Sequence, residues 1–224
     1  MLLCYVTDRS SLAHDPSSRA ITDDLMLCIR RAAVAGVDWI QIREKDLAAR
    51  ELLEVTRSAV AAAQRRVTAP RRDQPQVLVN DRLDIALAAD AAGVHLGGGS
   101  IPIGEIVRWC RAGNAPPDFQ VGASCHDVDD GIEAEHAGAN YIFFGPVYET
   151  PSKMKFGAPQ GIDKLAEVCS RVRIPVLAIG GINEGNAAAC MRAGAAGIAA
   201  IRLFQQTLND ATLGGVISRL RAIS

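Results

Sequence analysis

The chain has 224 residues, of which 49% are hydrophobic, and its 24 basic and 25 acidic residues leave a formal net charge of −1. This composition allows a sizeable packed core, and the near-neutral charge argues against a nucleic-acid partner. No stretch approaches the roughly 18 consecutive apolar residues of a membrane-spanning helix, and the first residues lack a basic leader. We therefore expect a cytoplasmic protein that has no membrane partner and acts on a small molecule.

Eight short apolar segments follow one another along the chain, and each leads into a polar or glycine-rich loop and a helical pattern. They cover residues 2–8, 35–44, 76–81, 92–100, 119–124, 137–146, 174–181 and 196–204. Strands without polar alternation are typical of a parallel sheet that is covered by helices. Eight βα units predict a closed (β/α)₈ barrel, the TIM barrel fold, as a single domain over residues 1–224. An open doubly wound sheet is the alternative.

Four of these segments open with the dipeptide Ala-Gly, and the glycines are Gly36, Gly93, Gly138 and Gly197. A glycine directly after a helix often adopts the left-handed conformation that closes the helix. We therefore expect each of the four glycines to mark a junction between a helix and the next strand.

The second segment ends in QIREK, which places Gln41, Arg43 and Lys45 at alternate positions of an extended chain. Alternate side chains point to the same side, and in a barrel the functional groups lie at the carboxyl ends of the strands. Arg binds paired oxygens and Lys supplies a point charge, so we favour a polyanionic ligand here over a solvated charge run.

Asp81 follows Asn80 at the end of the third segment. A carboxylate beside cationic side chains can hold Mg²⁺ against phosphate oxygens, since Mg²⁺ often needs only one or two protein carboxylates. The structural alternative is that Asn80 or Asp81 caps the following helix. The two roles are compatible because the residues are neighbours.

Three further places at the strand ends carry candidate functional groups. The sequence AIGGIN puts Gly180 and Gly181 before Asn183, which we expect to cap the next helix, and Arg202 lies at the end of the eighth strand. Free backbone N–H groups at such a helix start favour a phosphate. The alternative role for Gly180 and Gly181 is to permit a tight turn. In the loop after the sixth segment, Thr150, Ser152 and Lys153 are expected to lie over the cavity as a lid.

At this point the motifs resemble a known family. In chain order, QIREKD, LVNDRLDIALAADAAGVHLG, GASCH, FGPVYETPSK, APQG and VLAIGGIN are similar to segments of thiamin phosphate synthases and of the related TenI-type thiazole tautomerases. The resemblance covers most of the chain and implies a (β/α)₈ enzyme of thiamin (vitamin B1) biosynthesis. A synthase releases pyrophosphate from hydroxymethylpyrimidine diphosphate, and the resulting cation is captured by a thiazole phosphate. The implied partners are thus small phosphorylated pyrimidine and thiazole substrates.

The resemblance also implies roles for the matching residues. Those that match the pyrophosphate-binding positions are Gln41, Arg43, Lys45, Asn80 and Lys153. Asp81 matches a magnesium ligand and Ser124 lies beside the pyrimidine, while Thr150, Ser152 and Gly181 match positions that hold the thiazole phosphate. Mg²⁺ is therefore the implied cofactor of a synthase.

The chain departs from the synthase pattern at three positions. Ser100 stands where a second magnesium-binding aspartate is usual, Glu149 replaces a proline, and Arg202 replaces a serine near the phosphate. These departures keep open the alternative of a tautomerase, which moves a proton and needs neither pyrophosphate nor a cofactor.

The tautomerase pattern is incomplete as well, because Pro146 stands where its histidine is expected, so that His126 or Glu149 would have to carry the proton. The structural interpretation of His126 is a hydrogen-bonded residue that fixes the turn after the fifth strand. His95 is expected to be a packed imidazole bonded to a backbone carbonyl. We favour the synthase. A non-catalytic regulatory paralogue that binds thiamin intermediates is a third hypothesis, and a homodimer is expected by analogy with such barrels.

Overall fold

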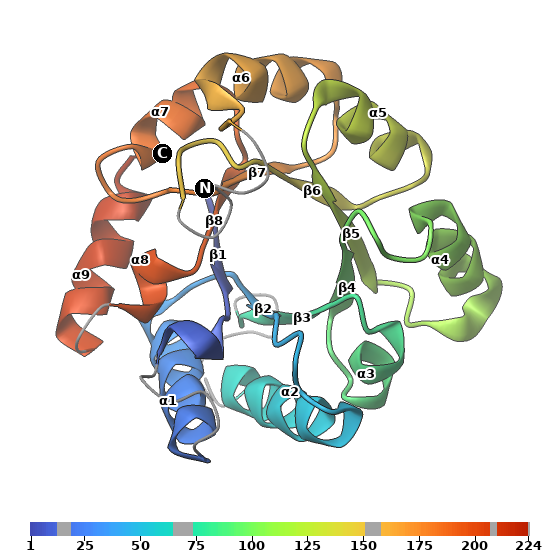
Figure 1. The fold of residues 1–224 in the computed structure, drawn as a ribbon, viewed down its shortest axis with the longest axis vertical. Coiled ribbons are helices and arrows are strands. Elements are labelled where there is room, and N and C mark those ends of the chain that lie inside the picture. Colours follow the sequence, from blue (N-terminus) through green and yellow to red (C-terminus); the bar gives the residue numbers. More distant parts are fainter. Residues whose placement is uncertain (13–18, 65–73, 151–157, 207–209, 224) are drawn as a thin grey trace.

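The computed structural model describes residues 1–12, 19–64, 74–150, 158–206 and 210–223. Within these residues eight parallel strands close into one barrel, and helices surround it (Figure 1). Each strand pairs with the next and β8 pairs with β1, which confirms the (β/α)₈ fold and excludes the open sheet. The strands are β1 (Leu2–Val6), β2 (Trp39–Ile42), β3 (Gln76–Asn80), β4 (Gly93–Leu96), β5 (Gln120–Cys125), β6 (Tyr141–Phe144), β7 (Val176–Ile179) and β8 (Gly197–Ala200).

The connections that follow the strands are mainly helical. They are η1 (Arg9–Ser11), α1 (Arg19–Ala35), α2 (Ala49–Gln64), α3 (Leu83–Ala88), α4 (Ile103–Trp109), which continues into the π turn η3 (Cys110–Asn114), α5 (Val128–His136), α6 (Gly161–Arg171), α7 (Ala187–Arg192), α8 (Arg202–Gln205) and α9 (Asp210–Arg221). In the described part of the chain, no helix combines the length and the apolar character needed to cross a bilayer.

The barrel interior is filled by side chains from alternate strand positions. Its apolar cluster contains Tyr141, Phe143 and Leu78, which are all buried, and Trp39 packs against it. The Tyr141 ring lies 4.6 Å from the Trp39 ring and 5.4 Å from the Phe143 ring, measured between centroids. These aromatic groups form a solid floor beneath the carboxyl end of the barrel.

A second and larger core lies between the strands and the helices. Residues that alternate with the interior ones, such as Ile40, Ile42 and Ile142, point outward into this layer and are fully buried. Both faces of each strand are therefore covered, which explains why the strand segments lack the polar alternation of a half-exposed sheet.

The Ala-Gly junctions follow two different rules. Gly36 and Gly138 have φ values of 98° and 95° and close helices as predicted. Gly93 and Gly197 also mark junctions between a helix and the next strand, but they are the first residues of β4 and β8 and do not close the helix. A side chain at either position would strike the backbone of the neighbouring strand, so these two glycines are required by close strand contact.

Candidate active site

A row of hydrogen-bonded polar side chains crosses the carboxyl rim of the barrel. Gln41 of β2 is only 2% exposed, and its Nε2 donates to Asn80 Oδ1 of β3 at 3.1 Å. Asn80 Nδ2 in turn donates to Asp81 Oδ2 at 2.6 Å. Three of the predicted site residues, from two strands, are thus in direct contact.

Asp81 faces the loop after β4 and does not cap α3, whose preceding residue Arg82 makes no side-chain capping bond. Its Oδ1 accepts the Gly97 N–H at 3.1 Å and the Ser100 hydroxyl. Partial burial opposes the charged form, but the bonds from Ser100 and Gly97 and the positive charge of Lys45 outweigh it and lower the pKa of Asp81. Asp81 is therefore an anion at neutral pH. The helix-cap interpretation was wrong, because the side chain is bonded to another strand end.

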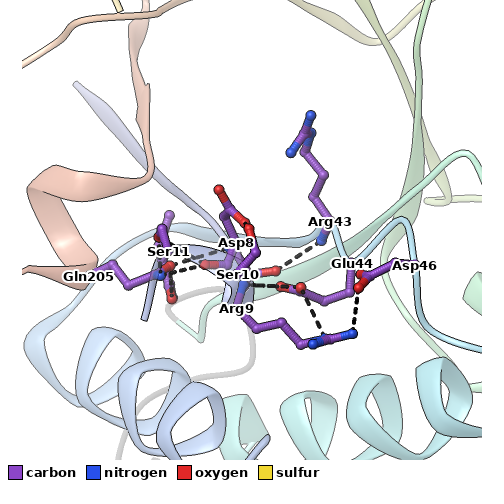
Figure 2. Close-up of polar contacts among 10 residues, drawn as sticks. Asp8, Arg9, Ser10, Ser11, Arg43, Glu44, Asp46 and Gln205 are labelled. Atoms are coloured by element: carbon purple, nitrogen blue, oxygen red, sulfur yellow. Dashed lines mark hydrogen bonds and ion pairs between the residues drawn. The ribbon is translucent and has the colours of Figure 1, made fainter. Parts of the chain in front are cut away.

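Arg43 and Lys45 continue the extended chain beyond β2 toward the same rim. Arg43 is half-buried, and Figure 2 shows its side chain extending away from Glu44 toward the space that the strands enclose. Burial lowers the pKa of His95, and the charge of Arg43 adds to this effect. The charge of Lys45 adds to the hydrogen bonds that lower the pKa of Asp81. Arg43 and Lys45 are thus close enough to influence these two residues.

His95 joins the rim to the aromatic floor. Its Nε2 lies 2.9 Å from Ser124 Oγ and its Nδ1 lies 3.2 Å from Tyr141 Oη. Burial and the charge of Arg43 outweigh the attraction of Asp81 and lower the pKa of His95 to about 3. The imidazole is therefore neutral. The expected backbone partner was wrong: two side-chain hydroxyls hold the ring, and one of them belongs to Ser124.

The loop after β7 is shaped by its two glycines, Gly180 and Gly181, with φ values of 93° and 68°. A Cβ atom at Gly181 would lie 2.6 Å from the Glu149 carbonyl oxygen and 2.7 Å from Tyr148 Cβ, so the loop after β6 packs directly on this glycine. The left-handed backbone and this contact both require glycine here, whatever ligand the loop binds.

The predicted cap at Asn183 was wrong, because α7 begins only at Ala187 and Asn186 precedes it. The Asn183 side chain instead accepts the Gly185 N–H at 2.8 Å and forms a local turn. Asn186 Nδ2 donates to the Gly181 carbonyl at 2.9 Å, which fixes the glycine loop. Short polar side chains often bond nearby backbone in this way, which delays the start of the helix.

The start of the loop after β6 is held against β7. Val147 N donates to the Ile179 carbonyl at 2.9 Å and Tyr148 N donates to the Gly180 carbonyl at 3.0 Å. Thr150 is half-buried and Glu149 is exposed. Ser152 and Lys153, with the central part of the expected lid, lie outside the described residues.

The two remaining candidates lie apart from the polar row. His126 Nδ1 contacts the Gly145 carbonyl, and its backbone N–H donates to Asp130 Oδ2 at 2.8 Å, so it links the ends of β5 and β6. This placement matches the structural interpretation of His126. Arg202 is exposed and forms the first residue of α8, directly after β8.

Comparison with known proteins decides the family. Residues 11–204 match the family described as thiamine monophosphate synthase. The chain belongs to this family. It is 43% identical to a putative thiamine-phosphate synthase of Geobacter sulfurreducens over 199 residues, covering 89% of this chain and 84% of the relative. It is 40% identical to a thiamine-phosphate synthase of Roseiflexus over 89% of this chain and 76% of the relative.

A solved structure agrees with this membership of the thiamine monophosphate synthase family. The thiamine phosphate pyrophosphorylase of Pyrococcus furiosus superposes with a TM-score of 0.77 at 31% identity, covering 99% of this chain and 94% of the other. The more distant 3-hexulose-6-phosphate synthase, at 20% identity and a TM-score of 0.68, shares the fold alone.

Mg²⁺ is the ion that the resemblance implies for synthases of this family, and the rim offers it few protein ligands. Among the described residues, no three His, Cys, Asp or Glu side chains come together as a metal site. In the polar row, Asp81 provides an ionised carboxylate, and Ser100 adds a neutral oxygen that is bonded to it. This set fits an ion that takes most of its ligands from water and phosphate, as Mg²⁺ commonly does.

Sequence reasoning missed a group of buried residues directly behind the rim. Thr7, Arg9 and Glu44 are 0%, 8% and 5% exposed, and their hydrogen bonds link the loops that follow β1 and β2. The available signal was the position of Glu44 between Arg43 and Lys45. In an extended chain this places Glu44 on the opposite side, among the outward-facing residues.

Proposed function

We propose that this chain is a thiamin phosphate synthase, a transferase that joins hydroxymethylpyrimidine diphosphate to a thiazole phosphate and releases pyrophosphate. The observation that carries this proposal is the row Gln41, Asn80 and Asp81 beside Lys45 at the rim of a barrel that belongs to this family. The bond between the pyrimidine methylene carbon and the pyrophosphate oxygen breaks, and both electrons leave with the pyrophosphate. The thiazole nitrogen then forms the new C–N bond.

Catalysis in this scheme is electrostatic. Arg43 and Lys45, with Lys153 of the loop after β6, would stabilise the charge that builds up on the departing pyrophosphate. Gln41 and Asn80 each carry an NH₂ group with two donors, one of which is used within the row. The second donor of each amide is therefore suited to a phosphate oxygen.

Asp81 would hold Mg²⁺, with Ser100 as a neutral neighbour in place of a second carboxylate. When bound, the ion would supply positive charge that neutralises pyrophosphate oxygens. With a single protein carboxylate, we expect the affinity for the metal alone to be weak and to rise when pyrophosphate is present.

The second substrate would lie toward β7 and β8. Gly180 and Gly181 bring the backbone of this loop close to the loop that carries Thr150, so both can contribute to a site for the thiazole phosphate. Ser152 and Arg202 are the further candidates for this phosphate. Ser124, held by His95, is proposed to contact the pyrimidine.

The tautomerase is the less supported alternative. The His126 Nδ1 is already engaged by the Gly145 carbonyl, and Pro146 occupies the position where the resemblance predicts a histidine. Glu149 is exposed and is the remaining candidate for a proton carrier. A cytoplasmic location and a homodimer complete the proposal; six free cysteines agree with a reducing compartment.

The test mixes the purified protein with both substrates and Mg²⁺ and follows thiamin phosphate and pyrophosphate. We expect turnover in the wild type, loss of turnover with EDTA, and at least a hundredfold lower kcat/KM in Asp81→Ala, since a charge-stabilising group is removed. Asp84→Ala is the matched control. Asp84 is an exposed carboxylate on α3 that pairs with Arg82 at 2.5 Å, so this variant should keep its activity.

Two other outcomes would replace the proposal. Conversion of the non-aromatic thiazole carboxylate tautomer, without coupling, would identify a tautomerase. Thermal stabilisation by the ligands without either reaction would identify a binding paralogue.

A further inference from the structure

A buried carboxylate joins the loops that follow β1 and β2. Glu44 lies on the side of the chain opposite Arg43, and its carboxylate accepts the Arg9 backbone N–H at 3.2 Å and 3.1 Å to its two oxygens (Figure 2). The Arg9 guanidinium pairs with Glu44 at 3.8 Å and with Asp46 at 2.6 Å. The loop after β1 is thus attached to the segment that carries Arg43.

Thr7, in the same loop after β1, fixes the backbone of Arg43. Its side chain is fully buried, its Oγ1 accepts the Arg43 N–H at 2.9 Å, and its hydroxyl contributes to lowering the pKa of the Glu44 carboxyl group. Thr7 thus holds Arg43 directly, while the next residue, Glu44, is held by the Arg9 N–H. The end of β2 is therefore attached to the loop after β1 at two successive residues.

The site requires an acceptor without donors. The Arg9 N–H donates to both oxygens of the carboxylate, and a glutamine would place an NH₂ group against this donor. Burial raises the pKa of Glu44, although the bonds from Thr7 and Arg9 and the charge of Arg9 oppose the rise, while Asp8 adds to it. The fold thus keeps a carboxylate at a position where burial disfavours its charge.

The other side of the loop after β1 is fixed as well. Gln205 Nε2 donates to the Asp8 carbonyl at 2.6 Å and to Ser11 Oγ at 2.8 Å, and its Oε1 accepts the Tyr5 hydroxyl at 2.9 Å. Gln205 of α8 thus anchors the loop after β1. The contacts of Thr7 and Glu44 in turn fix the end of β2 relative to this anchored loop.

We infer that Glu44 and Thr7 are positioning residues for Arg43: they fix the backbone at Arg43 so that its guanidinium is directed into the mouth of the barrel toward the leaving pyrophosphate. This inference rests on the proposed function for the identity of the anion. Neither residue touches the substrate in this scheme.

The test is a double-mutant cycle that measures the binding of inorganic pyrophosphate, with Mg²⁺, by calorimetry. We expect Glu44→Gln to weaken binding about tenfold, since a misdirected charged contact is worth about that much. In an Arg43→Ala background, Glu44→Gln should have almost no further effect. Thr7→Val should behave like Glu44→Gln, whereas Thr7→Ser, which keeps the hydroxyl, should bind like the wild type.

Asp38→Asn is the matched control. Asp38 also accepts a backbone N–H, that of Leu3 at 2.7 Å, and pairs with Arg221 at 2.8 Å, but it precedes β2 and so lies at the opposite pole from the mouth. The Asp38→Asn substitution should lower the melting temperature of the protein without changing its affinity for pyrophosphate.

Additive losses in the cycle, or equal losses in Asp38→Asn, would show a general structural role and overturn the inference. If Glu44→Gln fails to fold, the Thr7→Val and Thr7→Ser pair decides the question. A wild type that binds pyrophosphate without turnover would overturn the proposed function alone, and the cycle would still decide the inference. A wild type that binds no pyrophosphate would overturn both.

Discussion

At the scale of single residues, the rim depends on buried polar groups whose protonation is set by their surroundings. His95 is 1% exposed and bridges Ser124 and Tyr141, and its pKa of about 3 keeps the ring neutral in the folded protein. The unfolded chain binds a proton at this ring near pH 6.5, where histidine ordinarily titrates. Folding therefore excludes a proton between these two pH values.

This difference predicts a measurable pH dependence. As pH falls from about 6.5 toward 3, the unfolded state gains a proton that the folded state cannot take, so His95 contributes a loss of stability of up to about 1.4 kcal/mol per pH unit. In His95→Gln this contribution disappears. Urea unfolding of both proteins across this range should give a shallower pH dependence for the variant, and parallel curves would contradict the assignment.

Some residues of the rim were predictable from the sequence and others were not. The alternation of Gln41, Arg43 and Lys45 followed from their spacing beyond a strand. Glu44 was not singled out, because a carboxylate between two cations usually belongs to a solvated charge run. Its burial depends on contacts with Thr7 and Arg9, which lie about 35 residues earlier in the chain. Tertiary contacts of this kind leave no periodic signal.

At the scale of elements, strand order and packing determine where small residues are needed. The segments of all eight strands were predicted, because strands buried on both faces are apolar and end in polar loops. The cap at Asn183 was wrong, and Gly93 and Gly197 begin strands where a helix-closing role was expected, since these details depend on contacts with neighbouring loops and strands. The local sequence pattern thus determines whether a segment forms a strand or a helix, whereas contacts with neighbouring segments determine the residue at which it begins or ends.

The contact between β5 and β6 gives a test at this scale. A Cβ atom at Gly122 would overlap the ring of Tyr141, which is fully buried against Trp39 and Phe143 and has no room to move. Gly122→Ala should destabilise the protein by about 1–3 kcal/mol, as is usual for overpacking. Gly98→Ala is the control, because a Cβ atom there meets nothing within 4 Å. Equal unfolding midpoints in denaturant would contradict the prediction.

At the scale of the whole molecule, α9 completes the ring of helices and packs against α1 (Figure 1). Leu213, Val216, Ile217 and Leu220 of α9 are buried in the outer core. Arg221 at the end of α9 bonds the Met1 carbonyl and Asp38, which belong to the amino-terminal pole of the barrel. The end of α9 therefore stabilises the amino-terminal pole of the barrel, which is opposite the mouth.

This arrangement predicts that stability and ligand binding separate in Leu220→Ala. The substitution leaves a cavity at a fully buried position and should cost about 2–5 kcal/mol of unfolding free energy. Pyrophosphate affinity of the folded protein should not change. Arg219→Ala, at an exposed ion pair with Glu184, should change stability far less than Leu220→Ala. Equal effects of the two substitutions would contradict this view of α9.

The aromatic floor of Trp39, Tyr141 and Phe143 fills the barrel interior, so that the barrel is open at its carboxyl end and is not a channel. Ligands must therefore enter and leave through the carboxyl end. Under the proposed chemistry, pyrophosphate and the coupled product have to dissociate from this end before new substrates can bind, so product release contributes to the turnover rate.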